Sequence, residues 1–256
     1  KKIRINSLKM VNKASASHIG SALSIADIVS VLYGEIMKFD SSDINEDRDR
    51  FILSKGHACV AVYSVLAEMG FFPKKDLETY GENSSWLMNH ISHKVRGVEF
   101  STGALGHGLS FGVGKALSAK MQNKPWKTYV LLSDGEMDEG SNWEAMMFAS
   151  HHKLRNLISI IDYNKLQSLE SIEATLNLEP LVEKLESFGT EVIEIDGHNH
   201  DQLVKAFNQE TTVPKVILAN TIKGKGVDFM ENNVAWHYKS PNDEELDYAI
   251  RNLESE

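Results

Sequence analysis

The chain reads Leu132-Ser-Asp-Gly-Glu-Met-Asp-Glu-Gly140 and, after a helical-looking run, Leu157-Ile-Ser-Ile-Ile-Asp-Tyr-Asn-Lys-Leu-Gln167. In each segment an apolar strand ends on short oxygen-bearing side chains, and Asp134 and Asn164 stand 30 residues apart. A strand, a helix and a second strand in this order indicate a parallel unit, so both polar ends are expected at the same edge of one sheet. Open α/β sheets bind their ligands at that edge.

Oxygen-bearing side chains at two neighbouring strand ends suit a hard divalent cation. Mg²⁺ prefers oxygen ligands in octahedral geometry and usually takes only one or two from side chains, while phosphate and water complete its shell. Gly135 follows Asp134 and lets a phosphate come close to the backbone. The segment therefore indicates a Mg²⁺ and phosphate site. The alternative interpretation is a pair of strand-to-helix turns in which Asp134 and Asn164 only cap helices.

The composition is that of an ordinary globular protein. Of the 256 residues, 42% are hydrophobic and 25% are charged. The formal net charge of −9 argues against nucleic acid or an anionic membrane as the main partner. A phosphorylated ligand stays possible, because a bound Mg²⁺ would dominate the local field. Cys59 is the single cysteine, so the chain forms no internal disulfide, and a reducing cytoplasm is the expected location.

Strands and helices alternate along the chain. Periodicity predicts strands at 51–53, 129–132, 157–162, 191–196 and 216–220, and helices at 3–16, 58–69, 108–122, 142–152, 178–188, 201–208 and 243–254. Residues 73–100 are polar and irregular and predict a long functional loop. This order predicts one α/β domain over residues 1–256, with a parallel sheet and helices on both of its faces.

The polar strand ends resemble the thiamine-diphosphate signature, in which Gly-Asp-Gly is followed farther along by Asn. Ser133 stands where that signature usually has its first Gly. The resemblance implies that Asp134, the side chain of Asn164 and the backbone carbonyl of Leu166 bind Mg²⁺. It also implies that Ser133 and Gly135, together with Asp134 and Asn164, contact the cofactor.

Four further segments resemble motifs of the transketolase family. They are Ser15-Ala-Ser-His-Ile-Gly20, Leu53-Ser-Lys-Gly-His-Ala58, the Gly-rich run Val98-Glu-Phe-Ser-Thr-Gly-Ala-Leu-Gly-His-Gly108, and Thr221-Ile-Lys-Gly-Lys-Gly226 followed by Trp236-His237. Ala104 stands where Pro is common in that family. With the metal signature, five matches follow one another in the family's order across nearly the whole chain. The chain is therefore identified as a member of the transketolase family.

The resemblance covers the amino-terminal, pyrophosphate-binding part of a full-length transketolase. It implies thiamine-diphosphate- and Mg²⁺-dependent transfer of a two-carbon ketol unit from a ketose (phosphate) to an aldose (phosphate). The glutamate that such enzymes use against the aminopyrimidine ring lies on the pyrimidine-binding domain, so this chain is expected to be inactive alone. The expected partner is a carboxy-terminal subunit of a split transketolase, in an α₂β₂ assembly. A truncated longer protein is the other explanation.

The resemblance assigns the catalytic roles to four histidines, because imidazole can donate, accept or move a proton near neutral pH. His18 and His237 are implied to contact substrate oxygens and transfer protons, and His57 and His90 to hold the first hydroxyl and carbonyl oxygens. The family usually has Gly-His-Pro where this chain reads Asn89-His90-Ile91, so His93 competes with His90.

The remaining implied contacts lie on loops. Gly103 and Leu105 are implied to touch the cofactor's rings. Glu139 is implied to be a cofactor-binding residue that lies near the cofactor at the subunit interface and joins a carboxylate network there. That interface would contain the cofactor loop and residues 141–152. Its alternative role is to stabilise the start of the following helix through the helix dipole. For Lys223 and Lys225, contact with phosphate and a solvated turn are both open.

Two other functions compete with the transketolase assignment. The α-subunit of a 2-oxo acid dehydrogenase would share the metal signature, but it would have no reason to carry the motifs around His18, His57 and Gly103. A non-catalytic scaffold subunit should have lost Asp134, Asn164 or the histidines, and the chain retains all of them.

Overall fold

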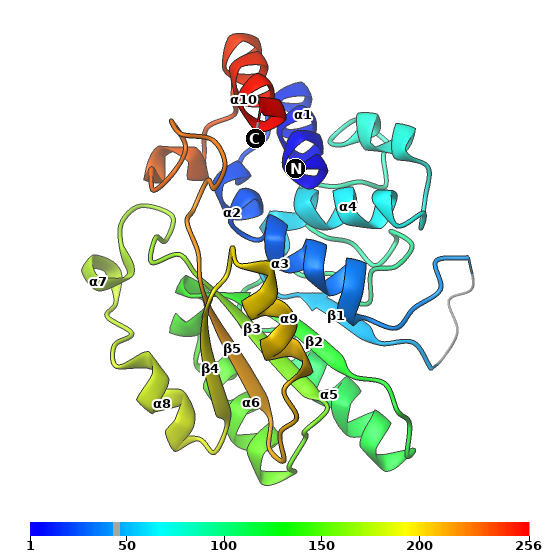
Figure 1. The fold of residues 1–256 in the computed structure, drawn as a ribbon, viewed down its shortest axis with the longest axis vertical. Helices are drawn as coiled ribbons and strands as arrows, with labels where there is room; N and C mark the ends of the chain where they lie inside the picture. The colour runs from blue at the N-terminus through cyan, green and yellow to red at the C-terminus, as the bar shows by residue number, and fades with distance from the viewer. Residues whose placement is uncertain (43–46, 256) are drawn as a thin grey trace.

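A parallel sheet of five strands forms the centre of the molecule (Figure 1). The structure is a computed structural model that describes residues 1–42 and 47–255. The strand order is β1-β2-β3-β5-β4, and every neighbouring pair is parallel, as predicted. The strands are β1 (Arg50–Leu53), β2 (Thr128–Ser133), β3 (Leu157–Tyr163), β4 (Glu191–Asp196) and β5 (Lys215–Asn220).

The register of β2 and β3 brings the two polar segments together. Ser133 at the end of β2 lies beside Asp162 near the end of β3. All seven residues of β3 are buried. The loops that carry Asp134 and Asn164 therefore leave the sheet side by side from its buried centre.

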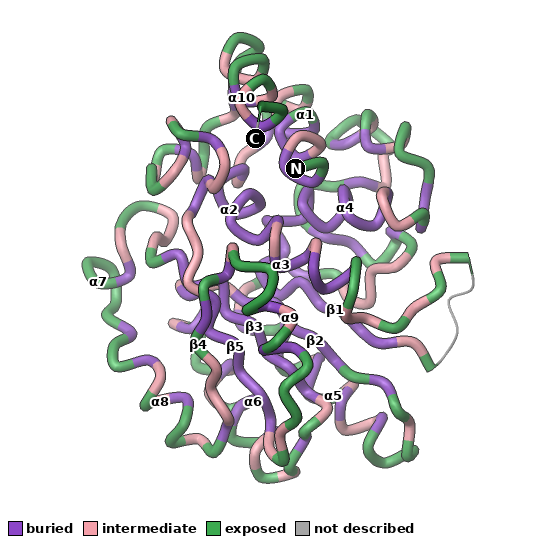
Figure 2. Tube along the Cα trace, viewed as in Figure 1, coloured by how far each residue is buried: buried purple, intermediate pink, exposed green. Residues whose placement is uncertain are grey.

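Helices cover both faces of the sheet because side chains of a strand alternate between the faces. Along β2, Tyr129 and Leu131 belong to the apolar core on one face, whereas Val130 and Leu132 belong to the core on the other. The first core is closed by α1 (Lys2–Ala14), α2 (Ile19–Ser24), α3 (Ala26–Val31), α4 (Cys59–Glu68) and α9 (His200–Asn208). The second is closed by α5 (Gly108–Met121), α6 (Gly140–His151) and α8 (Leu181–Ser187). Figure 2 shows the resulting buried central strands.

The two ends of the described chain meet on one side of the molecule. Helix α10 (Asp243–Ser255) packs against α1, and the Lys1 ammonium donates a hydrogen bond to the Glu254 carbonyl over 3.3 Å (Figure 1). The short helix α7 (Ile172–Thr175) and the 3₁₀ turns η2 (Gly56–Ala58), η3 (Lys74–Thr79), η4 (Gly135–Asp138) and η5 (Val234–His237) complete the elements, with the π-helical turn η1 (Leu32–Ile36). In the described part of the chain, no helix has the length and apolar character needed to cross a bilayer.

The predicted start of the helix at 178–188 was wrong. Helix α8 begins at Leu181, with Pro180 as its N-cap residue. A residue that precedes proline is sterically disfavoured in helical conformation, so Glu179 cannot continue a helix backwards. The sequence prediction also missed α7, which has only four residues. The irregular segment 73–100 was predicted correctly apart from the η3 turn.

Candidate active site

A cavity of about 270 Å³ lies at the carboxyl ends of β2 and β3. It brings together nearly all predicted site residues: His18, His57, His90, Gly103, Leu105, Ser133, Asp134, Gly135, Asn164, Leu166 and His237. Ser21, Lys55, Gln167, Ser168 and Lys223 complete its lining. These residues come from segments far apart in the chain, which the parallel sheet and its loops collect at one edge.

Asp134 is the buried carboxylate of this cavity. Its side chain accepts hydrogen bonds from the backbone N–H groups of Gly135 (2.7 Å) and Lys165 (2.6 Å), and the residue is 1% exposed. Burial, followed by the charge of Asp162, raises the pKa of Asp134 to about 7. A carboxylate desolvated in this way gains stability from a bound cation.

Asn164 is oriented by its own neighbours. Its amide nitrogen donates to Asp162 over 3.0 Å, and its amide oxygen accepts from the Leu166 N–H over 3.1 Å. The oxygen and nitrogen ends of the amide are thereby distinguished, since a carboxylate can only accept from the nitrogen.

Asp162 and Lys55 form a fully buried ion pair beneath the cavity. The two side chains are 0% and 1% exposed. The Asp162 carboxylate also accepts hydrogen bonds from Ser24 (2.6 Å) and Thr221. Burial alone would raise the pKa of Asp162, but the Lys55 charge and these hydrogen bonds hold it below its usual value. This network therefore keeps a charged acceptor in place for the amide nitrogen of Asn164.

The chemistry of the donor set fits Mg²⁺. Among the described residues, no group of three or more His, Cys, Asp or Glu side chains could hold a metal ion. The predicted set is of another kind, with one carboxylate, one amide oxygen and the Leu166 carbonyl, and such oxygen ligands leave room for phosphate and water. The Lys223 ammonium donates to this same carbonyl over 2.9 Å.

Lys223 determines the tautomer of His237. Its ammonium also donates to the Gln167 carbonyl over 2.8 Å and lies 3.1 Å from Nδ1 of His237. Because an ammonium only donates, Nδ1 accepts and the ring proton sits on Nε2. Burial, followed by the Lys55 charge, lowers the pKa of Lys223 to about 8.

The four predicted histidines form one cluster. The ring centre of His18 lies 5.0 Å from that of His57, 4.9 Å from that of His237 and 5.9 Å from that of His90. Burial is the main cause that lowers the pKa of His18 to about 4 and that of His237 to about 3, and it also lowers the pKa values of His57 and His90. The cluster is therefore neutral at pH 7 and presents both donor and acceptor nitrogens.

The Gly-rich loop is held against the cavity by a buried glutamate. Glu136 accepts from the Gly106 N–H over 2.9 Å and from the Ser54 hydroxyl, while Ser141 donates to the Gly106 carbonyl over 2.7 Å. A Cβ on Gly103 would approach the His90 ring to 3.2 Å, so this glycine permits close packing. Glu139 does not line the cavity; it is exposed and lies against Gly106.

The structure separates the residue pairs that the sequence left open. His90 lines the cavity, whereas His93 does not, and its ring lies 2.7 Å from the Ser101 hydroxyl. Lys223 is 1% exposed at the site, whereas Lys225 is partly exposed and pairs with Glu231 over 3.4 Å. The alternative of a solvated turn therefore applies to Lys225, whereas Lys223 is buried at the site.

Sequence reasoning missed the roles of Lys55, Asp162 and Glu136. All three lie inside quoted segments, and a charged residue at or just after the end of a buried strand was the available signal. It also missed His198, whose Nδ1 lies 2.8 Å from Asp27 and whose Nε2 accepts from the Ile222 N–H over 2.9 Å. That ring fixes the segment that carries Lys223.

Several known proteins are similar to this chain in sequence and in fold. The family model described as "Transketolase, thiamine diphosphate binding domain" matches residues 1–254. The chain is 40% identical over 250 residues to an apulose-4-phosphate transketolase subunit of Phocaeicola vulgatus, covering 96% of this chain and 89% of that protein. It is 40% identical over 260 residues to 6-deoxy-6-sulfo-D-fructose transketolase subunit SqwG of a Clostridium species, covering 99% and 94%.

The structure superposes on longer proteins as well. It matches the crystal structure of transketolase from Campylobacter jejuni with a TM-score of 0.92 and 32% sequence identity. The match covers 99% of this chain and 42% of that one. The chain thus spans less than half the length of this solved relative.

Proposed function

The chain belongs to the transketolase family, and on that premise we propose that it is the thiamine-diphosphate-binding subunit of a split transketolase. With a partner chain it transfers a two-carbon ketol unit from a ketose (phosphate) donor to an aldose (phosphate) acceptor. Relatives of nearly the same length are named transketolase subunits. The family assignment favours this function over the α-subunit of a 2-oxo acid dehydrogenase.

The gathering of four histidines above the Asp134–Asn164 edge is the observation that carries the proposal. Asp134, the Asn164 amide oxygen and the Leu166 carbonyl would hold Mg²⁺, and Gly135 would let the pyrophosphate approach. The bound cofactor supplies the electron sink for breaking a carbon–carbon bond beside a ketone.

The residues of this chain bind and orient the sugar and move its protons. His237 offers its Nε2–H as a donor, because Lys223 occupies its other nitrogen. The neutral rings of His18 and His237 can accept and donate protons at substrate oxygens, as general acid–base catalysis requires, and His57 would hold an oxygen of the donor. His90, less deeply placed at the mouth of the cavity, would hold a terminal oxygen of the donor.

A second chain completes the site in this proposal. The naming of the relatives as subunits of a transketolase supports the existence of a partner. We propose that this partner carries the pyrimidine-binding and carboxy-terminal domains. The two chains would form an α₂β₂ assembly, which we place in the cytoplasm. Helix α6 exposes Met147 (52%) and Phe148 (43%) near the exposed Glu139, and such apolar exposure supports an interface on this face.

The test measures cofactor binding and ketol transfer separately. Thiamine diphosphate with Mg²⁺ is titrated calorimetrically into the chain alone and into its mixture with a carboxy-terminal transketolase subunit. We expect tight binding and turnover only in the mixture, and loss of both in Asp134→Asn. Turnover by the purified chain alone would refute the shared site, and no binding in the mixture would refute the proposed function.

A further inference from the structure

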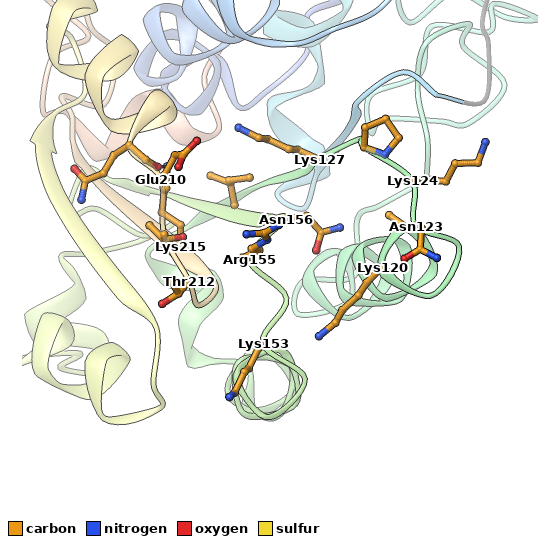
Figure 3. A pocket seen from close by; sticks show the side chains of 15 residues that line it. Lys120, Asn123, Lys124, Lys127, Lys153, Arg155, Asn156, Glu210, Thr212 and Lys215 are labelled. Carbon is orange, nitrogen blue, oxygen red and sulfur yellow. The ribbon is translucent and has the colours of Figure 1, made fainter.

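A larger cavity, of about 710 Å³, opens at the amino-terminal edge of the sheet, opposite the histidine cluster (Figure 3). It is formed by the loops that lead into β2, β3 and β5. Its lining comprises Ala119, Lys120, Asn123, Lys124, Pro125, Lys127, Lys153, Arg155, Asn156, Ile158, Gln209, Glu210, Thr211, Thr212 and Lys215. None of these residues takes part in the site described above.

The lining of this cavity is strongly basic. Six of its fifteen residues are Lys or Arg, and Glu210 is its one acidic residue. The whole chain, in contrast, has a formal net charge of −9. Positive charge is therefore concentrated in this cavity against the overall balance of the protein.

Three of the basic side chains have structural partners. Lys120 donates to the His152 carbonyl over 2.6 Å at the end of α6, and Lys215 donates to the Ala206 and Phe207 carbonyls at the end of α9. Cations stabilise helix carboxyl ends, so these two lysines serve the fold. Lys124 pairs with Asp47 over 2.7 Å.

The other three basic residues, Lys127, Lys153 and Arg155, are differently placed. Each is exposed, and within residues 1–42 and 47–255 none has a side-chain hydrogen bond or ion pair. Lys127 acts electrostatically on the buried Lys215: after burial itself, its charge is the next cause that lowers the pKa of Lys215 to about 8. The charges of these three residues are thus not balanced by an ion pair within the described part of the chain.

We propose that this cavity binds a small polyanion that carries several phosphate groups, of the nucleoside triphosphate or polyphosphate class. Its volume lies within the usual range for small-molecule sites, roughly 300–1,000 Å³. Arginine and lysine recognise phosphate by charge-assisted hydrogen bonds. Figure 3 shows Arg155 between Lys127 and Lys153, so the three free cations lie apart from one another, which suits several phosphates better than one. Thr211, Thr212 and Asn123 supply neutral hydrogen-bonding groups beside them.

The experiment titrates sodium tripolyphosphate, and separately ATP, into the full chain by calorimetry, at low and at physiological ionic strength. EDTA is present, so that binding at the Asp134 edge with Mg²⁺ does not contribute. We expect one saturable site with a dissociation constant below about 1 mM. The variant Lys127→Ala/Lys153→Ala/Arg155→Ala should weaken it by at least about tenfold, since exposed side chains are removed and the fold is retained.

The matched control removes the same charge elsewhere. Lys9, Lys75 and Lys94 are also exposed and lie outside the cavity, so their triple alanine variant should bind like the wild type. Equal weakening in both variants would mean a general electrostatic effect and would overturn the proposal. Absence of saturable binding, or preference for a single-stranded oligonucleotide over triphosphate, would overturn it as well. None of these results bears on ketol transfer.

Discussion

Replacing Lys55 by methionine should both destabilise the chain and weaken its cofactor site. The Asp162 carboxylate is 0% exposed and would lose its only charged partner among its hydrogen-bond donors Lys55, Ser24, Thr221 and Asn164. Removing one member of a buried ion pair costs about 3–5 kcal/mol, because the other charge stays buried and uncompensated. Urea unfolding of the chain should show a loss of that size.

The same substitution, Lys55→Met, should also weaken binding of Mg²⁺, because it disturbs the orientation of Asn164. Its amide nitrogen is bonded to Asp162, so a displaced or protonated Asp162 no longer fixes the amide oxygen toward Mg²⁺. Losing the partner of a metal ligand typically weakens metal affinity about 10–100-fold. Calorimetry of thiamine diphosphate and Mg²⁺ with the assembled protein should show this loss. Lys55→Met/Asp162→Leu should recover part of the lost stability without recovering affinity, because the uncompensated charge is gone and leucine offers no acceptor to the Asn164 amide nitrogen.

An exposed ion pair provides the control. Lys74 lies 2.6 Å from Glu68 and is 58% exposed, so Lys74→Met should change the free energy of unfolding by less than about 1 kcal/mol. If Lys55→Met lowered the free energy of unfolding no more than Lys74→Met, and cofactor affinity were unchanged, the buried pair would neither stabilise the fold nor support the metal site.

Three further outcomes follow from the same geometry. The pKa of Asp134 rises from 3.8 to about 7 on folding, so without a divalent cation stability should fall as pH rises between these values, by at most about 4 kcal/mol; Asp134→Asn should remove this slope in thermal unfolding with EDTA. The lowered pKa values of His18 and His237 should cost stability as pH falls from about 6.5 toward 4, and a His18→Gln/His237→Gln variant should lose less over this window. Lys153 has a left-handed backbone with φ 48°, so Lys153→Gly should raise unfolding stability by about 1 kcal/mol in urea titrations; a lower stability would contradict strain at this position.

The sheet and the cofactor edge could be predicted because they depend on local patterns. Apolar runs that end at Asp134 and Asn164 indicate strand ends, and parallel strands bring such ends together without further information. The start of α8 was mispredicted because Leu178 fits the helical period, although Glu179 precedes a proline and α8 begins only at Leu181.

The support beneath the site could not be predicted. Lys55 and Asp162 are separated by 107 residues, and neither pattern nor spacing marks two such side chains as partners. His90 and His93 occupy one irregular segment, where no period indicates which ring turns inward. Only the folded structure distinguishes them, since the His90 ring lines the cavity beside His18 and Gly103.

The burial of Lys223 has a consequence for covalent labelling. Lys223 and Lys225 flank Gly224, which has a φ of +83°, and the turn sends one amine inward and the other toward solvent. An amine-reactive reagent should therefore modify Lys225 readily and leave Lys223 untouched, although burial lowers the pKa of Lys223 to about 8 and a lowered pKa favours nucleophilic attack. Peptide mapping of the two neighbouring lysines would then report, within a single fragment, whether the closing turn of the site is folded.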